Sequence, residues 1–274
     1  MIISVLTENT AKNEHYKCEH GLCLHIATEK HKILFDTGAT ALFTENAATM
    51  DIDLSKVDAA ILSHGHLDHG GGLRTFFQIN AKANVYVQKR AFGAFYLNES
   101  DGGKIYVGLD SDLLSNDRFV LLDGDFTLDE GLQIFSNVIG DKYSPSENIH
   151  LLEKVGDEFR PDEFAHEQNL VVRENGKTLL VAGCAHRGIV NITEHFRKQH
   201  GSFPDFVVGG FHLYNRKADK GEDPAIIDAI SESLLATGSK FYTCHCTGLS
   251  PYKRLKSNMG EKIDYLSSGT QREL

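Results

Sequence analysis

The chain has 274 residues, of which 41% are hydrophobic and 24% charged, so it is long enough to bury a full core and is neither disordered nor a minimal disulfide scaffold. Its 28 Lys and Arg residues are outnumbered by 38 Asp and Glu residues, and the formal charge of -10 argues against a nucleic-acid partner. No run approaches the roughly 20 apolar residues of a membrane span and the first residues lack secretory-signal features, so we expect a cytoplasmic protein without a membrane partner.

The first third of the chain is predicted to be rich in β-strands. Apolar runs, with a turn at Lys30 and His31 between two of them, predict strands over residues 1–7, 22–29 and 31–38. The spacing of alanine, leucine and phenylalanine then fits a short amphipathic helix over residues 39–50, and residues 57–64 are typical of a buried strand that ends at His64. The first histidine-rich motif therefore begins where a strand is expected to end.

Strands and helices alternate in the second half of the chain. The apolar patterns predict a hairpin over residues 169–184, helices over 188–201 and 224–237, strands over 205–212 and 240–246, and a final short helix and strand. Residues 74–150 show no clear pattern, and their Gly- and Asp-rich part predicts a substrate-side insertion or lid within residues 90–118. Together these elements predict an α/β architecture with mixed sheets.

Four residues of metal-binding type lie together in the sequence HGHLDHGGGL. They are His64, His66, Asp68 and His69, and imidazole and carboxylate groups are the ligands that hold zinc, iron or manganese. Alternate residues of an extended segment point to one side, so His64 and His66 are expected to bind one ion while Asp68 and His69 turn toward another. The glycines at 70–72 are expected to let the backbone bend behind the ligands. The alternative is a solvated loop that happens to be rich in histidine.

The motif His-x-His-x-Asp-His resembles the signature of the metallo-β-lactamase superfamily. This resemblance implies one domain over residues 1–274, a four-layer αββα sandwich of two mixed β-sheets, with metals at one edge where loops from both halves meet. Further motifs are similar to the subgroup named after 7,8-dihydropterin-6-yl-methyl-4-(β-D-ribofuranosyl)aminobenzene 5'-phosphate synthase; they are EHGL at 19–22, LFDTG at 34–38, HEQNLVV at 166–172, GCAHRGIVNI at 183–192, GGFHL at 209–213 and HCTG at 245–248.

The resemblance implies two divalent transition-metal ions, with zinc expected and iron or manganese left open. His186 is the expected third ligand of the first ion, and His245 is the expected ligand of the second. Cys184 stands where common members carry a bridging Asp, so it is either a bridging thiolate or a buried structural thiol beside a bridging hydroxide. His166 and Glu167 are further candidates for the metal site, against the alternative of a surface histidine and a structural carboxylate.

Four other residues are candidates for supporting roles. Asp36 is expected to orient a ligand imidazole, to form a turn, or both. Arg187 follows a predicted ligand at a helix start, where it suits a phosphate or carboxylate group, although a surface arginine is an equal alternative. His212 is expected to contact substrate or metal or merely to pack, and the resemblance places His20 in the pocket lining. The remaining cysteines are expected to be ordinary reduced thiols.

The expected chemistry is hydrolysis by metal-activated hydroxide, with Asp68 as a metal ligand that also orients the attacking water. The expected substrate is a small ester or phosphoester that carries a phosphate or carboxylate group. The alternatives are a pterin-linked condensing enzyme that acts on a phosphoribosyl substrate, a diiron redox enzyme, and a non-catalytic sensor that binds a metabolite. A redox relative would usually carry an acidic bridging residue and a flavin domain, and neither is visible. The sequence carries no prediction of oligomeric state.

Overall fold

The computed structural model describes residues 1–99 and 101–274, and Ser100, which falls within the predicted insertion or lid, lies outside the described residues. The chain divides into two units, each with its own seven-stranded sheet. Unit 1 comprises Met1–Asp125, His150–Gln168 and Ser267–Leu274. Unit 2 comprises Phe126–Ile149 and Asn169–Leu266.

The large sheet of unit 1 is mixed. Its strands are, in spatial order, β20 (Gln271–Glu273), β1 (Ile2–Thr7), β2 (Cys23–Ala27), β3 (Lys32–Phe35), β4 (Ala59–Ile61), β5 (Asn84–Gln88) and β8 (Phe119–Leu122). The pairs from β20 to β3 are antiparallel, and the pairs from β3 to β8 are parallel. Parallel neighbours need crossover connections, and the helices of this unit lie in those connections.

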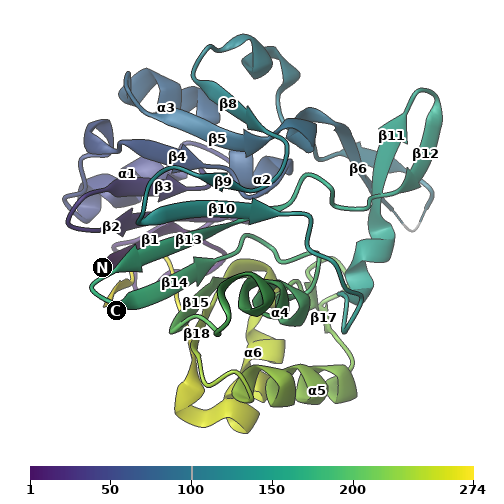
Figure 1. The fold of residues 1–274 in the computed structure, drawn as a ribbon. Helices are drawn as coiled ribbons and strands as arrows, with labels where there is room; N and C mark the ends of the chain where they lie inside the picture. The colour runs from purple at the N-terminus through teal and green to yellow at the C-terminus, as the bar shows by residue number, and fades with distance from the viewer. Residues whose placement is uncertain (100) are drawn as a thin grey trace. The chain divides into compact units, whose positions relative to one another are not determined.

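The α-helices of unit 1 are short, with four to eight residues each. They are α1 (Leu42–Thr49), α2 (Leu67–Gly70) and α3 (Leu73–Ile79), with one-turn 3₁₀ helices η1 (Leu54–Lys56), η2 (Lys89–Phe92) and η3 (Ser111–Ser115). Phe43 and Ala47 of α1 and Leu73 and Phe76 of α3 belong to a single core cluster with the sheet (Figure 1). The helix α3 was not predicted, because it has only seven residues and only Leu73 and Phe76 among them are buried.

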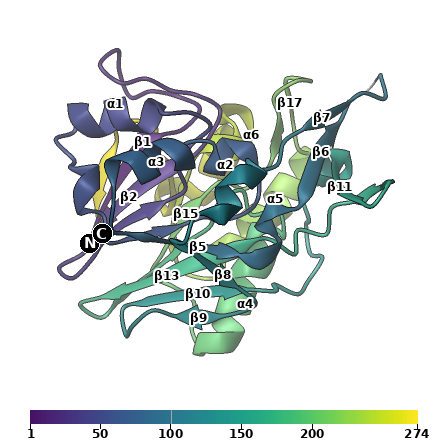
Figure 2. The ribbon, with the colours of Figure 1, turned by 90° about the horizontal axis from the view of Figure 1, so that it is seen from above.

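A second, four-stranded sheet of unit 1 includes two strands from the predicted insertion. Its strands, all antiparallel, are β12 (Glu158–Pro161), β11 (Leu151–Val155), β6 (Ala94–Asn98) and β7 (Lys104–Tyr106). Figure 2 shows β6, β7 and β11 side by side. A role for these residues as a lid stays a prediction.

Unit 2 also contains a mixed sheet. Its strands are, in order, β19 (Ile263–Tyr265), β18 (Lys240–Thr243), β15 (Phe206–Gly209), β14 (Lys177–Val181), β13 (Gln168–Glu174), β10 (Leu132–Ser136) and β9 (Phe126–Thr127). The predicted hairpin is the antiparallel pair of β13 and β14, while β14, β15, β18 and β19 are parallel. A small hairpin is formed by β16 (Tyr214–Asn215) and β17 (Lys220–Gly221).

Three helices of unit 2 lie together on one side of its sheet (Figure 1). They are α4 (Ile189–His200), α5 (Pro224–Leu235) and α6 (Leu249–Met259), and the short 3₁₀ helices are η4 (Ser146–His150), η5 (His245–Thr247) and η6 (Gly260–Lys262). Asp223 accepts a hydrogen bond from the Ala225 N–H at the start of α5, and the left-handed Gly201 ends α4. Residues of all three helices form one core cluster with the sheet, which includes Phe196, Ile230 and Leu255.

Two predicted strands end earlier than expected. The strand expected to reach His64 ends at Ile61, and the strand expected to reach His212 ends at Gly209. His212 has a φ of +50°, which an extended strand does not allow. His64 and His212 therefore lie in loops that follow parallel strands.

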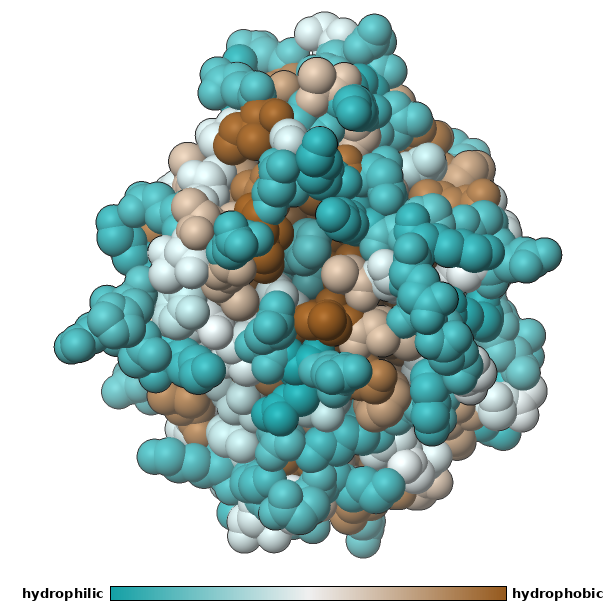
Figure 3. Space-filling view, turned by 90° about the vertical axis from the view of Figure 1, so that its left-hand side faces the viewer, coloured by the Kyte–Doolittle hydropathy of each residue, from teal (hydrophilic) through white to brown (hydrophobic). Residues whose placement is uncertain are grey.

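The surface shows no large apolar feature on the face drawn in Figure 3, where hydrophilic residues predominate and hydrophobic residues gather in small groups. Among the helices that the structure describes, none is long and apolar enough to cross a membrane.

Candidate metal centre

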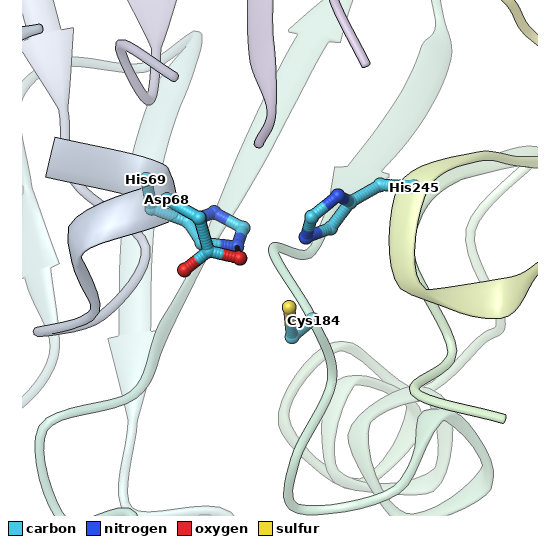
Figure 4. Close-up of side chains that lie close together, drawn as sticks. All are labelled: Asp68, His69, Cys184 and His245. Atoms are coloured by element: carbon cyan, nitrogen blue, oxygen red, sulfur yellow. Dashed lines mark ion pairs between the residues drawn. The ribbon is translucent and has the colours of Figure 1, made fainter. Parts of the chain in front are cut away.

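The first motif occupies the loop after β4 and the short helix α2. His64 lies in the loop, His66 is the residue before the helix, and Asp68 and His69 project from the helix itself (Figure 4). His64, His66 and His69 are all buried. The extended segment expected from the sequence thus covers only the first two histidines, because residues 67–70 form a helical turn.

The glycines after the motif are required by close backbone packing and not by a left-handed conformation. Gly71 and Gly72 have φ values of -64° and -80°, which other residues adopt readily. A Cβ atom at Gly71 would lie 2.1 Å from the Ala39 carbonyl oxygen, and one at Gly72 would lie 2.3 Å from the Thr37 carbonyl oxygen. The backbone of α2 therefore approaches the loop after β3 so closely that only glycine fits.

Asp36, at the end of β3, holds the two innermost histidines through a buried hydrogen-bond network. Its Oδ2 atom lies 2.7 Å from His69 Nδ1 and accepts a hydrogen bond of 2.8 Å from the Ser63 hydroxyl. Its Oδ1 atom accepts the Ser63 backbone N–H at 2.7 Å. The Ser63 oxygen in turn lies 2.8 Å from His64 Nδ1.

This network determines which ring nitrogen carries the proton. The Asp36 carboxylate only accepts, so His69 donates from Nδ1. The single hydroxyl proton of Ser63 is used on Asp36, so His64 Nδ1 donates to the Ser63 oxygen. Both imidazoles therefore present Nε2 as a lone-pair donor, which is the form that binds a metal. Burial, with the nearby imidazoles of His69 and His66, also lowers the pKa of His64 well below its usual value, which favours the neutral ring.

His66 belongs to a second buried group, with Asp162 and His166. His166 Nδ1 accepts the Gly65 N–H at 2.9 Å, so its Nε2 carries the proton and donates to Asp162 at 3.0 Å. His66 Nε2 lies 3.8 Å from the same carboxylate, which is too far for a hydrogen bond. Burial acts to raise the pKa of Asp162, but the hydrogen bond from His166 and the nearby ring of His66 hold it well below its usual value.

Asp68 is accompanied by the predicted pocket histidine. His20 Nε2 lies 3.4 Å from Asp68 Oδ2, and His20 Nδ1 lies 3.2 Å from the Asn9 amide nitrogen. His69 Nε2 lies 3.7 Å from the same Asp68 oxygen. The structure thus brings His20 to the carboxylate that is expected to bind metal. Glu167, the other candidate of this region, is buried, and its backbone N–H donates to the Phe164 carbonyl.

The second set of candidate ligands lies in unit 2. Cys184 and His186 occupy the loop between β14 and α4, and His245 begins η5 just after β18 (Figure 4). The side chain of Asn148 brackets His186, because its Oδ1 atom lies 3.0 Å from His186 Nδ1 while its amide donates to the His186 carbonyl at 2.8 Å. The amide oxygen is the acceptor in this pair, so His186 also presents Nε2.

His212 and Arg187 lie beside these ligands in unit 2. The rings of His186 and His212 have centroids 4.3 Å apart, and the His212 N–H points to Cys246 Sγ at 3.3 Å. Arg187 donates from Nε to the Val138 carbonyl at 3.2 Å. The helix α4 begins at Ile189, two residues after this arginine, close to the start predicted from the sequence.

Sequence reasoning missed the residues that orient the histidines. Ser63 is a polar residue at the end of an apolar run and next to a motif histidine, which is a usable signal. Asp162 precedes His166 by four residues, which is a weaker one. Asn148 has no signal in the sequence, because it belongs to a segment without a clear pattern. All five cysteines are unbridged, as expected for reduced thiols.

The donor set in each unit fits transition-metal ions. Neutral imidazoles, a carboxylate and a thiol are ligands for zinc, iron or manganese, whereas calcium and magnesium prefer all-oxygen sites. Within unit 2, one ligand atom each of Cys184, His212 and Cys246 lies within 4.8 Å of the others. The same holds for His66, Asp162 and His166 in unit 1, but there both ring nitrogens of His166 already make hydrogen bonds. Metal binding is therefore chemically reasonable in both units.

Three known proteins are similar to the chain over nearly its whole length. Two are proteins of Methanocaldococcus jannaschii, each 27% identical to it. The first is named "Uncharacterized protein MJ0448" and the match covers 93% of both chains. The second is named 7,8-dihydropterin-6-methyl-4-(beta-D-ribofuranosyl)-aminobenzene-5'-phosphate synthase, and the match covers 98% of this chain and 94% of that protein.

The third is a crystal structure of Tm1679, described as a metal-dependent hydrolase of the beta-lactamase superfamily. It is 28% identical to this chain, has a TM-score of 0.83, and the match covers 100% of this chain and 99% of that structure. Since each unit of the present chain also has a mixed sheet with helices, the α/β metallo-β-lactamase fold predicted from the sequence is confirmed.

The family model of the metallo-beta-lactamase superfamily matches residues 17–196. The match covers more than half of the chain and includes the motif from His64 to His69 as well as the loop of Cys184 and His186. The chain therefore belongs to the metallo-β-lactamase superfamily.

Proposed function

We propose that the protein is a metal-dependent hydrolase with a dinuclear centre. His64, His66 and His186 bind one divalent ion, and Asp68, His69 and His245 bind the other. Zinc is the ion that this histidine-rich set favours, and iron or manganese would also suit it. Cys184 contributes a thiolate to the same centre, and the location we propose is the cytoplasm.

The observation that carries this proposal is the network of Asp36. A buried carboxylate that receives three hydrogen bonds and fixes the Nδ1 protons of two neighbouring imidazoles has little purpose in a merely structural histidine cluster. It is the arrangement by which proteins orient histidine ligands and raise their basicity. Asn148 does the same for His186 with an amide.

The bound ions would supply a hydroxide at neutral pH and neutralise charge that develops on the substrate. The side chains of this chain then have separate tasks. Asp68 orients the attacking water while it binds metal. His20, whose Nε2 lies 3.4 Å from Asp68 Oδ2, holds that carboxylate in place. His166 acts as a positioning residue for His66 through Asp162, because both of its nitrogens already make hydrogen bonds.

The substrate we propose is a small ester or phosphoester that carries a phosphate or carboxylate group. Arg187 donates from Nε to the Val138 carbonyl, and its planar guanidinium is the kind of group that binds phosphate or carboxylate oxygens. Its position one residue from Gly188 and the start of α4 adds the positive end of a helix dipole. His212, beside His186, is proposed to contact the substrate.

A second candidate function is a pterin-linked condensation on a phosphoribosyl substrate. The relative that favours it is the synthase of Methanocaldococcus jannaschii, which is 27% identical over 98% of this chain. In that reaction the same ions would bind a phosphorylated group, so the ligand assignment would stand and only the reaction would change.

Metal analysis combined with a substrate panel tests both. Protein purified without chelator is expected to contain two equivalents of a transition metal and to hydrolyse members of a panel of phosphodiesters, phosphomonoesters, lactones and thioesters. Condensation of a pterin with a phosphoribosyl substrate, without activity on the panel, would favour the second candidate. Protein free of transition metal and unable to bind added zinc would refute the dinuclear centre.

A further inference from the structure

Two cysteines of unit 2 lie next to each other although 62 positions separate them in the chain. The Sγ atoms of Cys184 and Cys246, together with one ring nitrogen of His212, all lie within 4.8 Å of one another. The Cys246 thiol points at the Cys184 carbonyl oxygen, 3.7 Å away. Each cysteine is almost fully buried, with 2% and 5% of its surface exposed.

The sheet of unit 2 brings these sulfur atoms together. Cys184 follows β14 and Cys246 follows β18, and the strand between them is β15, which pairs with both in parallel. All three loops therefore leave the same edge of the sheet. Gly210, in the loop after β15, makes room for the sulfur, because a Cβ atom there would lie 2.4 Å from Cys246 Sγ.

A disulfide requires the two sulfur atoms to approach to roughly 2.05 Å, with a Cβ separation of about 3.8 Å. The two sulfurs lie within 4.8 Å of each other, so rotation about the two Cα–Cβ bonds, together with movement of the backbone, must close the remaining distance. Cys184 lies in a loop and Cys246 in the short 3₁₀ helix η5, so the regular hydrogen bonds of the sheet do not oppose this movement.

We propose that Cys184 and Cys246 form a thiol pair that hydrogen peroxide converts into a disulfide. One sulfur attacks peroxide, so the O–O bond breaks, a sulfenic acid forms and the first water leaves with the thiol proton. The other sulfur then attacks the sulfenic sulfur, the S–S bond forms, and the S–O bond breaks to release the second water. Two thiols lose two electrons in total, and one peroxide is reduced to two waters.

Oxidation of this pair would change the candidate metal centre. This consequence rests on the proposed function, in which Cys184 contributes a thiolate to the ions. A sulfur atom in a disulfide carries no negative charge and is a poor ligand for zinc. Oxidised protein is therefore expected to lose metal, and bound metal is expected to slow the oxidation.

The test uses the full-length, metal-free protein treated with hydrogen peroxide, followed by alkylation of remaining thiols in denaturant and digestion after Lys and Arg. Cys184 is then alone in peptide 178–187, whereas Cys244 and Cys246 share peptide 241–253. The expected product is a cross-link between these two peptides that reduction removes. C244S is the matched control, since Cys244 is also buried and lies in the same segment.

The cross-link is expected to persist in C244S and to disappear in C246S, with circular dichroism used to confirm that both variants fold. Should C246S fail to fold, C246A provides the same comparison. Alkylation of both Cys184 and Cys246 at a peroxide dose that oxidises the exposed Cys18 would overturn the proposal, as would a cross-link that C244S removes.

Metal content, measured before and after oxidation of the loaded protein, separates this inference from the proposed function. A cross-link accompanied by metal loss supports both. A cross-link in a protein that never binds metal would refute the dinuclear centre and leave the thiol pair supported. A cross-link that forms with full retention of both ions would overturn the link between the thiol pair and the metal centre.

Discussion

The two units solve one chemical problem with different side chains. In unit 1 a buried carboxylate, Asp36, receives the Nδ1 proton of His69 and orders His64 through Ser63. In unit 2 a neutral amide, Asn148, receives the Nδ1 proton of His186 and also donates to the carbonyl of the same residue. In both arrangements Nδ1 carries the proton, so the lone pair of Nε2 is available to a metal.

The difference teaches what each kind of acceptor contributes. A carboxylate raises the basicity of the ligand nitrogen more than an amide does, and it accepts hydrogen bonds from several donors at once. Because burying a charge is costly, a buried carboxylate needs these hydrogen bonds. An amide adds no charge, and its bracket fixes the backbone and the ring of one residue together. We therefore expect metal binding in unit 1 to depend more on the charge of the acceptor Asp36, and metal binding in unit 2 to depend more on the shape of the acceptor Asn148.

The largest effect is expected from a variant that removes a proposed metal ligand of unit 1. His66→Ala is expected to lower kcat/KM at least about a thousandfold with the fold largely retained, because hydroxide generation by the metals contributes several kcal/mol to the transition state. Activity assays with circular dichroism check this, and His31→Ala, at a partly exposed turn, is the control. A collapsed circular dichroism spectrum of His66→Ala would show that the metal is structural.

The second prediction tests charge at Asp36. Asp36→Asn keeps the size of the side chain and tolerates the φ of +60°, but its NH₂ group must face a donor. Placed on the Oδ2 side, it would donate to His69 Nδ1 and move the ring proton to Nε2. Metal affinity is expected to fall about 100-fold, measured by chelator competition.

Asp53→Asn is the control for this variant, since the exposed Asp53 carboxylate only accepts from Ser55 at the start of η1. Unchanged metal affinity in Asp36→Asn would mean that the carboxylate has no part in orienting the ligands, and the comparison between the two units would lose its basis.

The third prediction tests shape at Asn148. Asn148→Ala is expected to weaken metal binding about 30-fold, because His186 loses the acceptor at Nδ1 that fixes its tautomer. Asn148→Asp keeps an acceptor for Nδ1 and loses only the bond to the carbonyl, so it should retain most of the affinity. Equal losses in both variants, measured by metal titration, would contradict an orienting role for the acceptor.

The smallest expected effect concerns substrate charge. Because the chain as a whole is acidic, anion binding must come from local groups. Arg187→Ala is expected to raise KM about tenfold for a phosphate- or carboxylate-bearing substrate, or about 1.4 kcal/mol, with less effect on a neutral ester of similar size. Arg197→Ala, on the exposed part of α4, is the matched control. Equal losses on charged and neutral substrates would show that Arg187 only supports its loop.

The sequence predicts ligands that are close in the chain and misses partners that the fold brings from afar. The motif from His64 to His69 is recognisable because its spacing is local. Asn148 hydrogen-bonds to His186, which is 38 positions away in the chain. The group of Asp162 and His166 depends on Gly65, whose N–H donates to His166 from 101 positions away. No periodicity within a short window contains that information.

Strand and helix types were largely predictable and their ends were not. Apolar runs identify β4 and β15, but each strand ends three residues before the histidine that was expected to close it. The helix α3 escaped prediction because its amphipathic pattern is only seven residues long. The order of strands in each sheet also arises from long-range pairing, which the sequence pattern does not encode.

The pairing of β20 with β1 has a consequence for how the protein is made. Strand β1 begins at Ile2 and its outer neighbour β20 begins at Gln271, and all of unit 2 lies between them in the chain. During synthesis β1 therefore emerges long before its outer neighbour, because all of unit 2 must be made between the two strands. Until β20 is made, one edge of β1 offers unpaired backbone groups to any neighbouring chain, so the nascent protein is open to edge-to-edge aggregation throughout this interval.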